Sequence, residues 1–236
     1  MTEPAAAVKP IAPRRSVLSR LQLGIEALYR VDTQLDVQLF LVSDLERRRT
    51  GVARTPREQL LVSQRGSDEV AIGLFLDQQA VENLEQNDPA RGLDQTNFDD
   101  FCLVVEGVSH FVYVAVCAAR ERSVSALELE LQAEVDKFAC CLLVAGADAS
   151  NDVSTDDSSA RGLRRRLYGD IAFAVDLDGE ERDRYRVANL EARRYTESLS
   201  RTFVASDRVG EMLPELRRFY RFGLEAKLGH IAQLAG

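Results

Sequence analysis

The first hydrophobic pattern along the chain has the period of a helix. Ser16 opens the segment 16–29, where its hydroxyl can accept a hydrogen bond from the first helical turn. The apolar residues of this segment recur at spacings of three and four: Val17, Leu18, Leu21, Ile25 and Leu28. We therefore predict a short amphipathic helix over 16–29, preceded by a disordered leader over 1–15 that contains alanines and prolines.

Three short segments predict strands. The segment 35–42 alternates between apolar and polar residues and then becomes wholly apolar, which favours a strand over the start of a helix. The segments 59–64 and 69–76 are rich in β-prone residues and are separated by Arg65-Gly66-Ser67-Asp68. Glycine and aspartate suit a tight turn, so these two segments predict an antiparallel hairpin.

The stretch after the hairpin begins with a short helix and a loop. Asp77 can cap a helix over 78–85, and the polar segment 86–97 contains Pro89 and Gly92, which are typical of loops.

The segment 98–120 is almost wholly apolar and admits two interpretations. Its valines and the pair Glu106-Gly107 are compatible with two strands joined by a turn, whereas its length and the capping residues Asn97 and Asp99 favour a buried helix. We predict the helix. The next segment, 123–144, predicts a second helix, because Ser125 and Glu128 resemble a capping box and its apolar residues keep helical spacing: Leu127, Leu131, Val135, Phe138 and Leu142.

The C-terminal part predicts a linker followed by helices. The segment 146–159 is small, acidic and rich in serine, and it predicts a flexible linker. Beyond it we predict one further strand, over 170–177, and helices over 160–168, 180–205 and 207–234. Pro214 suits the first turn of a helix, so the regular part of the last helix is expected to begin there.

Together these elements predict an α+β fold. A small antiparallel sheet within 35–76 packs on the long buried helices of 98–145, which gives an α+β core over 16–145. The helical part 160–236 is expected to pack back on that core through apolar residues such as Leu190, Leu216 and Phe219. At 236 residues, with 45% of them hydrophobic, one domain is more consistent with this pattern than two.

Charge is distributed unevenly along the chain. The net charge is −8 and the isoelectric point is about 5.0, but the acidic excess lies within 1–157 and the arginines concentrate in 158–236. A nucleic-acid-binding protein usually has a basic domain, so nucleic acid is not an expected partner.

The cysteines and the hydropathy indicate a cytoplasmic protein without a membrane span. Cys102, Cys117, Cys140 and Cys141 lack the paired spacing of zinc sites and predict buried, reduced thiols. The longest apolar run, 104–119, is interrupted by Glu106 and His110 and is shorter than the roughly 18 to 20 apolar residues that a membrane span needs.

Glu106 and His110 are the strongest candidates for catalytic chemistry, because both lie in an otherwise apolar segment. If that segment is a helix, they share a face with Tyr113 and Cys117. A buried carboxylate beside an imidazole can transfer a proton, or the pair can simply order the core. With Glu130 and Glu134 of the following helix, Glu106 and His110 are candidate ligands for a divalent metal, although the Glu-x-x-His spacing of carboxylate-bridged bundles is absent. We expect no cofactor, and a divalent metal is the alternative.

Arginines interleaved with tyrosines form the second candidate surface. The candidates for binding an anion or a partner are Arg186 and Arg193 on one predicted helix and Arg218 and Arg221 on the last. The same C-terminal set includes Arg164, Arg165, Arg166 and Lys227. Acidic residues lie among them, so ordinary ion pairs along the helices are the simpler explanation of many of these charges.

The sequence contains no motif that specifies a reaction. Glycine-rich phosphate loops, a Gly-x-Ser-x-Gly elbow and His-Glu-x-x-His are all missing. We therefore predict a non-enzymatic cytoplasmic interaction or assembly protein that binds a protein partner, or itself, through the Arg/Tyr-rich helices. The alternative is a metal- or small-ligand-dependent enzyme with a pocket around Glu106 and His110.

Overall fold

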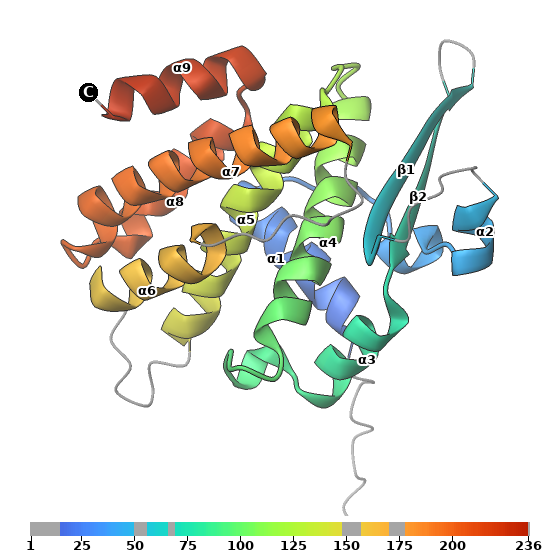
Figure 1. Cartoon of the computed structure of the whole chain (residues 1–236), viewed down its shortest axis with the longest axis horizontal. Helices are drawn as coiled ribbons and strands as arrows, with labels where there is room; N and C mark the ends of the chain where they lie inside the picture. The colour runs from blue at the N-terminus through green and yellow to red at the C-terminus, as the bar shows by residue number, and fades with distance from the viewer. Residues whose placement is uncertain (1–14, 50–55, 66–68, 148–156, 170–177, 236) are drawn as a thin grey trace, which may run out of the picture.

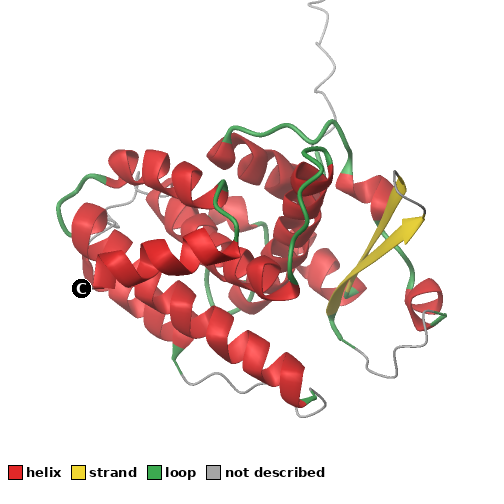
Figure 2. Cartoon of the chain, turned by 90° about the horizontal axis from the view of Figure 1, so that it is seen from above, coloured by secondary structure: helices red, strands yellow, loops and turns green. Residues whose placement is uncertain are grey.

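The computed structural model describes residues 15–49, 56–65, 69–147, 157–169 and 178–235. Two long helices, α4 (Phe98–Ala118) and α5 (Ala126–Ala147), lie at the centre, with a two-stranded hairpin on one side and the C-terminal helices on the other (Figure 1). The fold is therefore α+β with far more helix than strand, and both Figure 1 and Figure 2 show this.

The first helix confirms the sequence pattern. It is α1 (Val17–Tyr29), and the Ser16 hydroxyl accepts a hydrogen bond from Ser19 N at 3.2 Å. The apolar stripe is buried, with Val17, Ile25 and Tyr29 each 1% exposed. Burial of one face and a side-chain cap together account for a helix of this length.

The segment predicted as a strand over 35–42 is instead a turn of 3-10 helix, η1 (Val37–Phe40), followed by the short helix α2 (Asp44–Arg48). The Asp36 carboxylate accepts a hydrogen bond from Gln38 N at 3.1 Å, and such local side-chain bonds favour a turn over a strand. Only Leu41 joins the sheet, as an isolated parallel bridge to Leu74.

The hairpin is confirmed. Strands β1 (Glu58–Arg65) and β2 (Glu69–Leu76) pair antiparallel in a register that places Leu60 opposite Leu74. Gly107 of α4 permits their close approach to the helix, because a Cβ there would lie 2.7 Å from Leu76 Cδ2. The predicted turn residues 66–68 lie outside the described residues.

The short helix after the hairpin and the loop that follows it are confirmed. The helix is α3 (Gln78–Gln86), and the Asp77 carboxylate accepts a hydrogen bond from Gln79 N at 2.9 Å. The loop includes a single turn of 3-10 helix, η2 (Pro89–Arg91).

The segment 98–120 is a helix and not a hairpin. Asn97 precedes α4 without capping it, because its side-chain oxygen instead accepts a hydrogen bond from Asp94 N at 3.0 Å. In the following helix the Ser125 hydroxyl accepts from Glu128 N at 3.2 Å, which forms the first half of the expected capping box. By length and composition α4 resembles a membrane span, but 78% of its most apolar window is buried inside the fold, as in a core helix.

The C-terminal part packs on α5 but divides differently from the prediction. Its elements are α6 (Asp157–Tyr168), α7 (Gly179–Leu199), a π-helical turn η4 (Ser200–Val204), α8 (Val209–Tyr220) and α9 (Leu224–Ala235). The predicted linker over 146–159 is therefore helical at both ends, while its middle, 148–156, lies outside the described residues, as does the strand predicted over 170–177.

The single helix predicted over 207–234 is wrong. The helix is interrupted at Arg221–Gly223, where glycine disfavours helix. Beside the interruption, the carbonyl of Phe219 accepts a hydrogen bond from Lys227 Nζ at 3.0 Å. Pro214 lies inside α8, not in its first turn.

The core is one hydrophobic cluster that extends from Val17 to Ile231. Leu216 and Phe219 of the C-terminal helices belong to it, as predicted. Leu190 does not, because it is 44% exposed on the outer face of α7.

Candidate functional site

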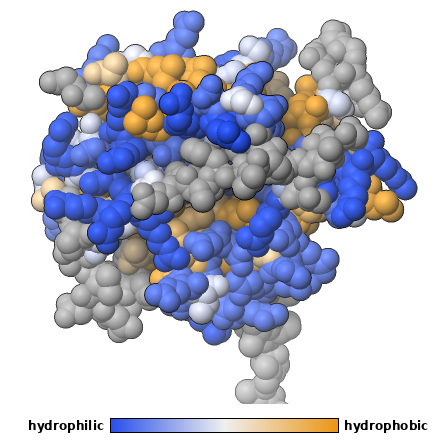
Figure 3. Space-filling view, in the orientation of Figure 1, coloured by the Kyte–Doolittle hydropathy of each residue, from blue (hydrophilic) through white to orange (hydrophobic). Residues whose placement is uncertain are grey.

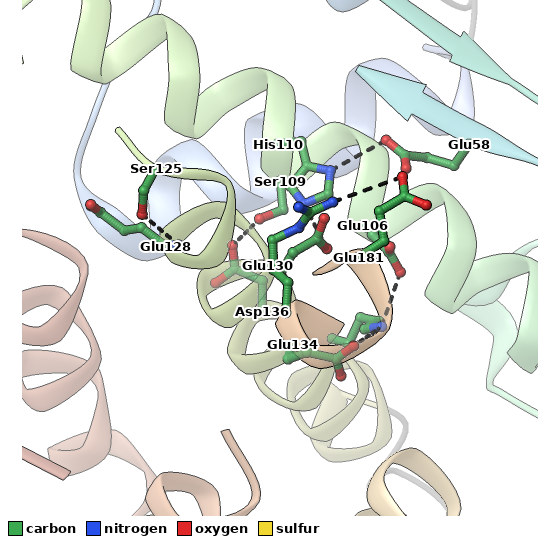
Figure 4. A network of polar contacts seen from close by, with 12 residues as sticks. Glu58, Glu106, Ser109, His110, Ser125, Glu128, Glu130, Glu134, Asp136 and Glu181 are labelled. Atoms are coloured by element: carbon green, nitrogen blue, oxygen red, sulfur yellow. Dashed lines mark hydrogen bonds and ion pairs between the residues drawn. The ribbon is translucent and has the colours of Figure 1, made fainter. Parts of the chain in front are cut away.

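His110 is buried between two carboxylates, of which the sequence indicated Glu130 but not Glu58. It is 5% exposed, and its Nδ1 lies 3.3 Å from Glu58 Oε1 on β1. Its Nε2 lies 3.6 Å from Glu130 Oε2 on α5. Figure 4 shows His110 and Glu58 pointing toward each other between α4 and the hairpin. His110 therefore links three elements of the core.

Glu106 does not pair with His110. Its Oε2 lies 3.0 Å from Lys137 Nζ, which also donates to Glu134 Oε1 at 2.7 Å. The four predicted metal ligands are thus divided between a histidine group and a lysine group. Within the described ranges, no three His, Cys, Asp or Glu side chains form an arrangement that could hold a metal ion.

The charges of these two groups explain their pKa values. Burial alone lowers the pKa of His110, but Glu58 and Glu130 outweigh it and hold that pKa well above its usual value. Burial likewise lowers the pKa of Lys137, and Glu106 and Glu134 reverse the effect. Burial, together with neighbouring carboxylates, raises the pKa values of Glu58 and Glu134, because the carboxylates outnumber the cations.

The expected stripe along α4 ends in a third, separate group. Tyr113 donates to Glu128 Oε1 at 2.7 Å, and Arg122 donates to the same oxygen at 2.6 Å and to Cys117 Sγ at 2.8 Å. Burial raises the pKa of the Cys117 thiol. All four cysteines are free thiols, as predicted, although Cys102 and Cys140 are only half-buried.

A fully buried polar network beside these groups was missed by the sequence reasoning. The carboxylate of Asp136 accepts hydrogen bonds from Tyr29, from Ser109 at 2.5 Å and from Gln132 at 2.8 Å. Gln132 in turn accepts from Lys227 Nζ at 2.5 Å. The available signal was the polar stripe Glu128, Gln132 and Asp136, whose spacing of four places them on one face of α5.

Lys227, assigned from the sequence to the surface arginine set, is in fact 0% exposed. Its ammonium group lies 4.2 Å from the centre of the Phe219 ring. Burial lowers the pKa of Lys227 to about 7, while burial raises the pKa of Asp136 in spite of its hydrogen bonds. The hydrogen bonds of Asp136 and Lys227 satisfy these buried polar groups and order the core.

An open site lies on the other side of the molecule, between α6, α7 and η4. We call it the arginine pocket. Its volume is about 510 Å³, and it is lined by Arg161, Arg164, Arg165, Tyr168, Gly169, Arg193, Glu197, Arg201 and Ala205. The face of the molecule shown in Figure 3 is hydrophilic over α6. Because π-helical turns such as η4 occur frequently at functional sites, this location is a suitable one for binding.

The arginines of the pocket differ from the other arginines of the same helices. Among the described residues, Arg164, Arg165, Arg193 and Arg201 have no ion pair with a carboxylate, and Nη1 of Arg164 is buried without a hydrogen-bond partner. Outside the pocket, carboxylates accompany the arginines at i,i+3: Arg184 with Glu181, Arg186 with Asp183 and Arg194 with Glu191. Unpaired positive charge is therefore concentrated in the pocket.

Only one of the four predicted anion-binding arginines reaches this pocket. Arg193 lines it, whereas Arg186 pairs with Asp183. Arg218 lies 3.9 Å from Glu215, and Arg221 donates to the carbonyl of Arg217 at 2.8 Å. Arg164 and Arg165 were also noted in the sequence, but their position beside Arg193 was not predicted and Arg201 was not a candidate.

Comparison of the chain with protein-family models, with curated proteins and with solved structures gave no significant match, so its function is argued from its own geometry.

Proposed function

We propose that this chain is a non-enzymatic interaction protein of the cytoplasm that binds an anionic face of a protein partner at the arginine pocket. The observation that supports this proposal is a cavity lined by four arginines, Arg164, Arg165, Arg193 and Arg201, that have no ion pair with a carboxylate among the described residues. Crowded guanidinium groups repel one another, so the arrangement favours occupation by an anion.

The alternative, an enzyme centred on Glu106 and His110, has less geometric support. His110 is 5% exposed, and Glu106 pairs with Lys137 and not with His110. Four free cysteines are consistent with the proposed reducing compartment.

A matched pair of variants tests the proposal. Arg165→Gln with Arg193→Gln removes two exposed charges from the pocket, and Arg186→Gln with Arg194→Gln removes two exposed charges of α7 that have ion-pair partners elsewhere. Quantitative pull-down from a cell extract should capture a partner with the wild type and the control variant but not with the pocket variant. Capture should also weaken as salt is raised.

Two results would contradict the proposal. One is capture of the same proteins, in equal amount, by the pocket variant. The other is the absence of any partner in the pull-down combined with a monomer in native mass spectrometry, because the chain would then bind neither another protein nor itself.

A further inference from the structure

The lining of the arginine pocket restricts the chemistry of its ligand. A cavity of about 510 Å³ is lined by a single glutamate, Glu197, together with four arginines that have no ion pair with a described carboxylate: Arg164, Arg165, Arg193 and Arg201. Such a volume is within the range of small-molecule sites and has room for more than one anionic group. A single carboxylate carries one negative charge, whereas a phosphoryl group carries about 1.5 to 2 at neutral pH. Phosphoryl groups therefore neutralise this pocket with fewer contacts.

The type of cation points in the same direction. All the basic residues of the lining are arginines, and the planar guanidinium group matches two oxygens of a phosphate at once. Arg164 Nη1 is buried and has no hydrogen-bond partner among the described residues, so one donor is already desolvated and available. Forming a bond to that donor recovers the cost of its burial.

The lining offers little to an apolar or aromatic ligand. Its two largely apolar members are Ala205 and Tyr168. The Tyr168 side chain is buried, and its hydroxyl donates to the carbonyl of Glu134 at 2.8 Å, so it belongs to the core packing. Recognition in this pocket therefore rests on charge and hydrogen bonding and not on stacking of a ring.

We propose that the arginine pocket is a site for a ligand that carries two or more neighbouring phosphoryl groups. This inference rests on the proposed function and specifies the anionic chemistry of its partner. Arg165 and Arg193 line the site from α6 and α7, and Arg164 supplies the buried donor. Arg201 lines it from η4, where its Nη2 also donates to the carbonyl of Leu234 at 3.2 Å. Such phosphoryl groups are carried either by a soluble polyphosphorylated molecule or by a doubly phosphorylated protein segment.

Isothermal titration calorimetry on the full chain distinguishes the relevant chemistries. The titrants are pyrophosphate, a peptide with two adjacent phosphoserines, and the same peptide with aspartates at those positions. Pyrophosphate and the phosphopeptide should each bind at least about tenfold more tightly than the aspartate peptide, because their charge is denser and their oxygens fit the guanidinium groups. Tight binding of pyrophosphate alone identifies a soluble ligand, and tight binding of the phosphopeptide identifies a protein segment.

The variants described above locate the site. Arg165→Gln with Arg193→Gln should weaken pyrophosphate binding by at least about tenfold, and Arg186→Gln with Arg194→Gln by less than about twofold. Circular dichroism of both variants checks that each one is folded, and the single variant Arg165→Gln repeats the test with a smaller change.

The possible failures of the two proposals can be told apart. Equal affinity for the phosphorylated and aspartate peptides would overturn the phosphoryl assignment and leave the proposed function standing. Binding of pyrophosphate that is equally strong in the pocket variant would overturn the site. Absence of binding for all three titrants would overturn the phosphoryl assignment, and the pull-down would then decide the proposed function by itself.

Discussion

The charged groups of the core and the arginines of the pocket meet opposite conditions in the same molecule. Lys137 is held between Glu106 and Glu134, and Lys227, 0% exposed, donates to Gln132 and to a backbone carbonyl. The exposed Arg165 and Arg193 have no carboxylate partner among the described residues. A buried charge must be paired for the chain to fold, whereas a surface charge stays solvated without a partner. The need to satisfy buried charges therefore explains the contacts of the core groups. The pocket arginines have no such explanation, and we assign them to binding.

The largest expected effect is a loss of stability when a charged group of the core loses its partner. Lys137→Met removes the cation shared by Glu106 and Glu134 and leaves the buried Glu134 carboxylate without it, and we expect a loss of about 3 kcal/mol in the free energy of unfolding at pH 7. Urea denaturation measures it. The loss should shrink as the pH falls, because burial raises the pKa of Glu134 and the carboxyl group becomes neutral. A loss below about 1 kcal/mol would show that the lysine group is not a stabilising part of the core.

The second expected effect is a pH dependence of the free energy of unfolding, and it is caused by the buried Lys227. The pKa of Lys227 is about 7 in the folded protein and near 10.4 in the unfolded chain. Below pH 7 both states carry the proton, so the folded state bears the full cost of the buried cation. Above pH 7 only the unfolded chain keeps it, so the stability of the wild type rises with pH until about 10.4.

Lys227→Met removes this dependence. Relative to that variant, the wild type should gain about 3 kcal/mol between pH 6 and pH 9. Denaturation of both proteins at several pH values provides the measurement. A difference between them that stays constant over this range would mean that Lys227 keeps an ordinary pKa and that the core is better solvated at this point than its burial indicates.

The smallest expected effect is on the pocket side. Arg165→Gln with Arg193→Gln should change the free energy of unfolding by less than about 0.5 kcal/mol, because it removes solvated charges that repel their neighbours. The control, Arg186→Gln with Arg194→Gln, breaks two surface ion pairs and should be no more stable than the pocket variant. Thermal melts compare the two. If the pocket variant lost more than about 1 kcal/mol, its arginines would be structural and the contrast with the core would fail.

Elements that depend on local interactions could be predicted from the sequence. The helix α1, the hairpin and the long helices α4 and α5 follow from periodicity, and Ser16 and Asp77 cap helices as their side chains allow. The prediction was wrong at 35–42, where the Asp36 side chain stabilises a turn, and in the last helix, which breaks before Leu224. In both places a single side-chain contact outweighs a general preference.

The sequence by itself determined which side chains needed partners, and the tertiary structure decided which partners they found. A carboxylate and an imidazole in an apolar helix cannot stay buried alone, so Glu106 and His110 indicated a polar core. Helical spacing predicted that they pair with each other. In the folded chain His110 instead contacts Glu58, which is 52 residues away, and Glu106 contacts Lys137. The same holds for the arginine pocket, because Arg164 and Arg165 of α6 meet Arg193 and Arg201 only when α6 packs on α7 and η4. Contacts between distant segments depend on the whole fold, and no local spacing encodes them.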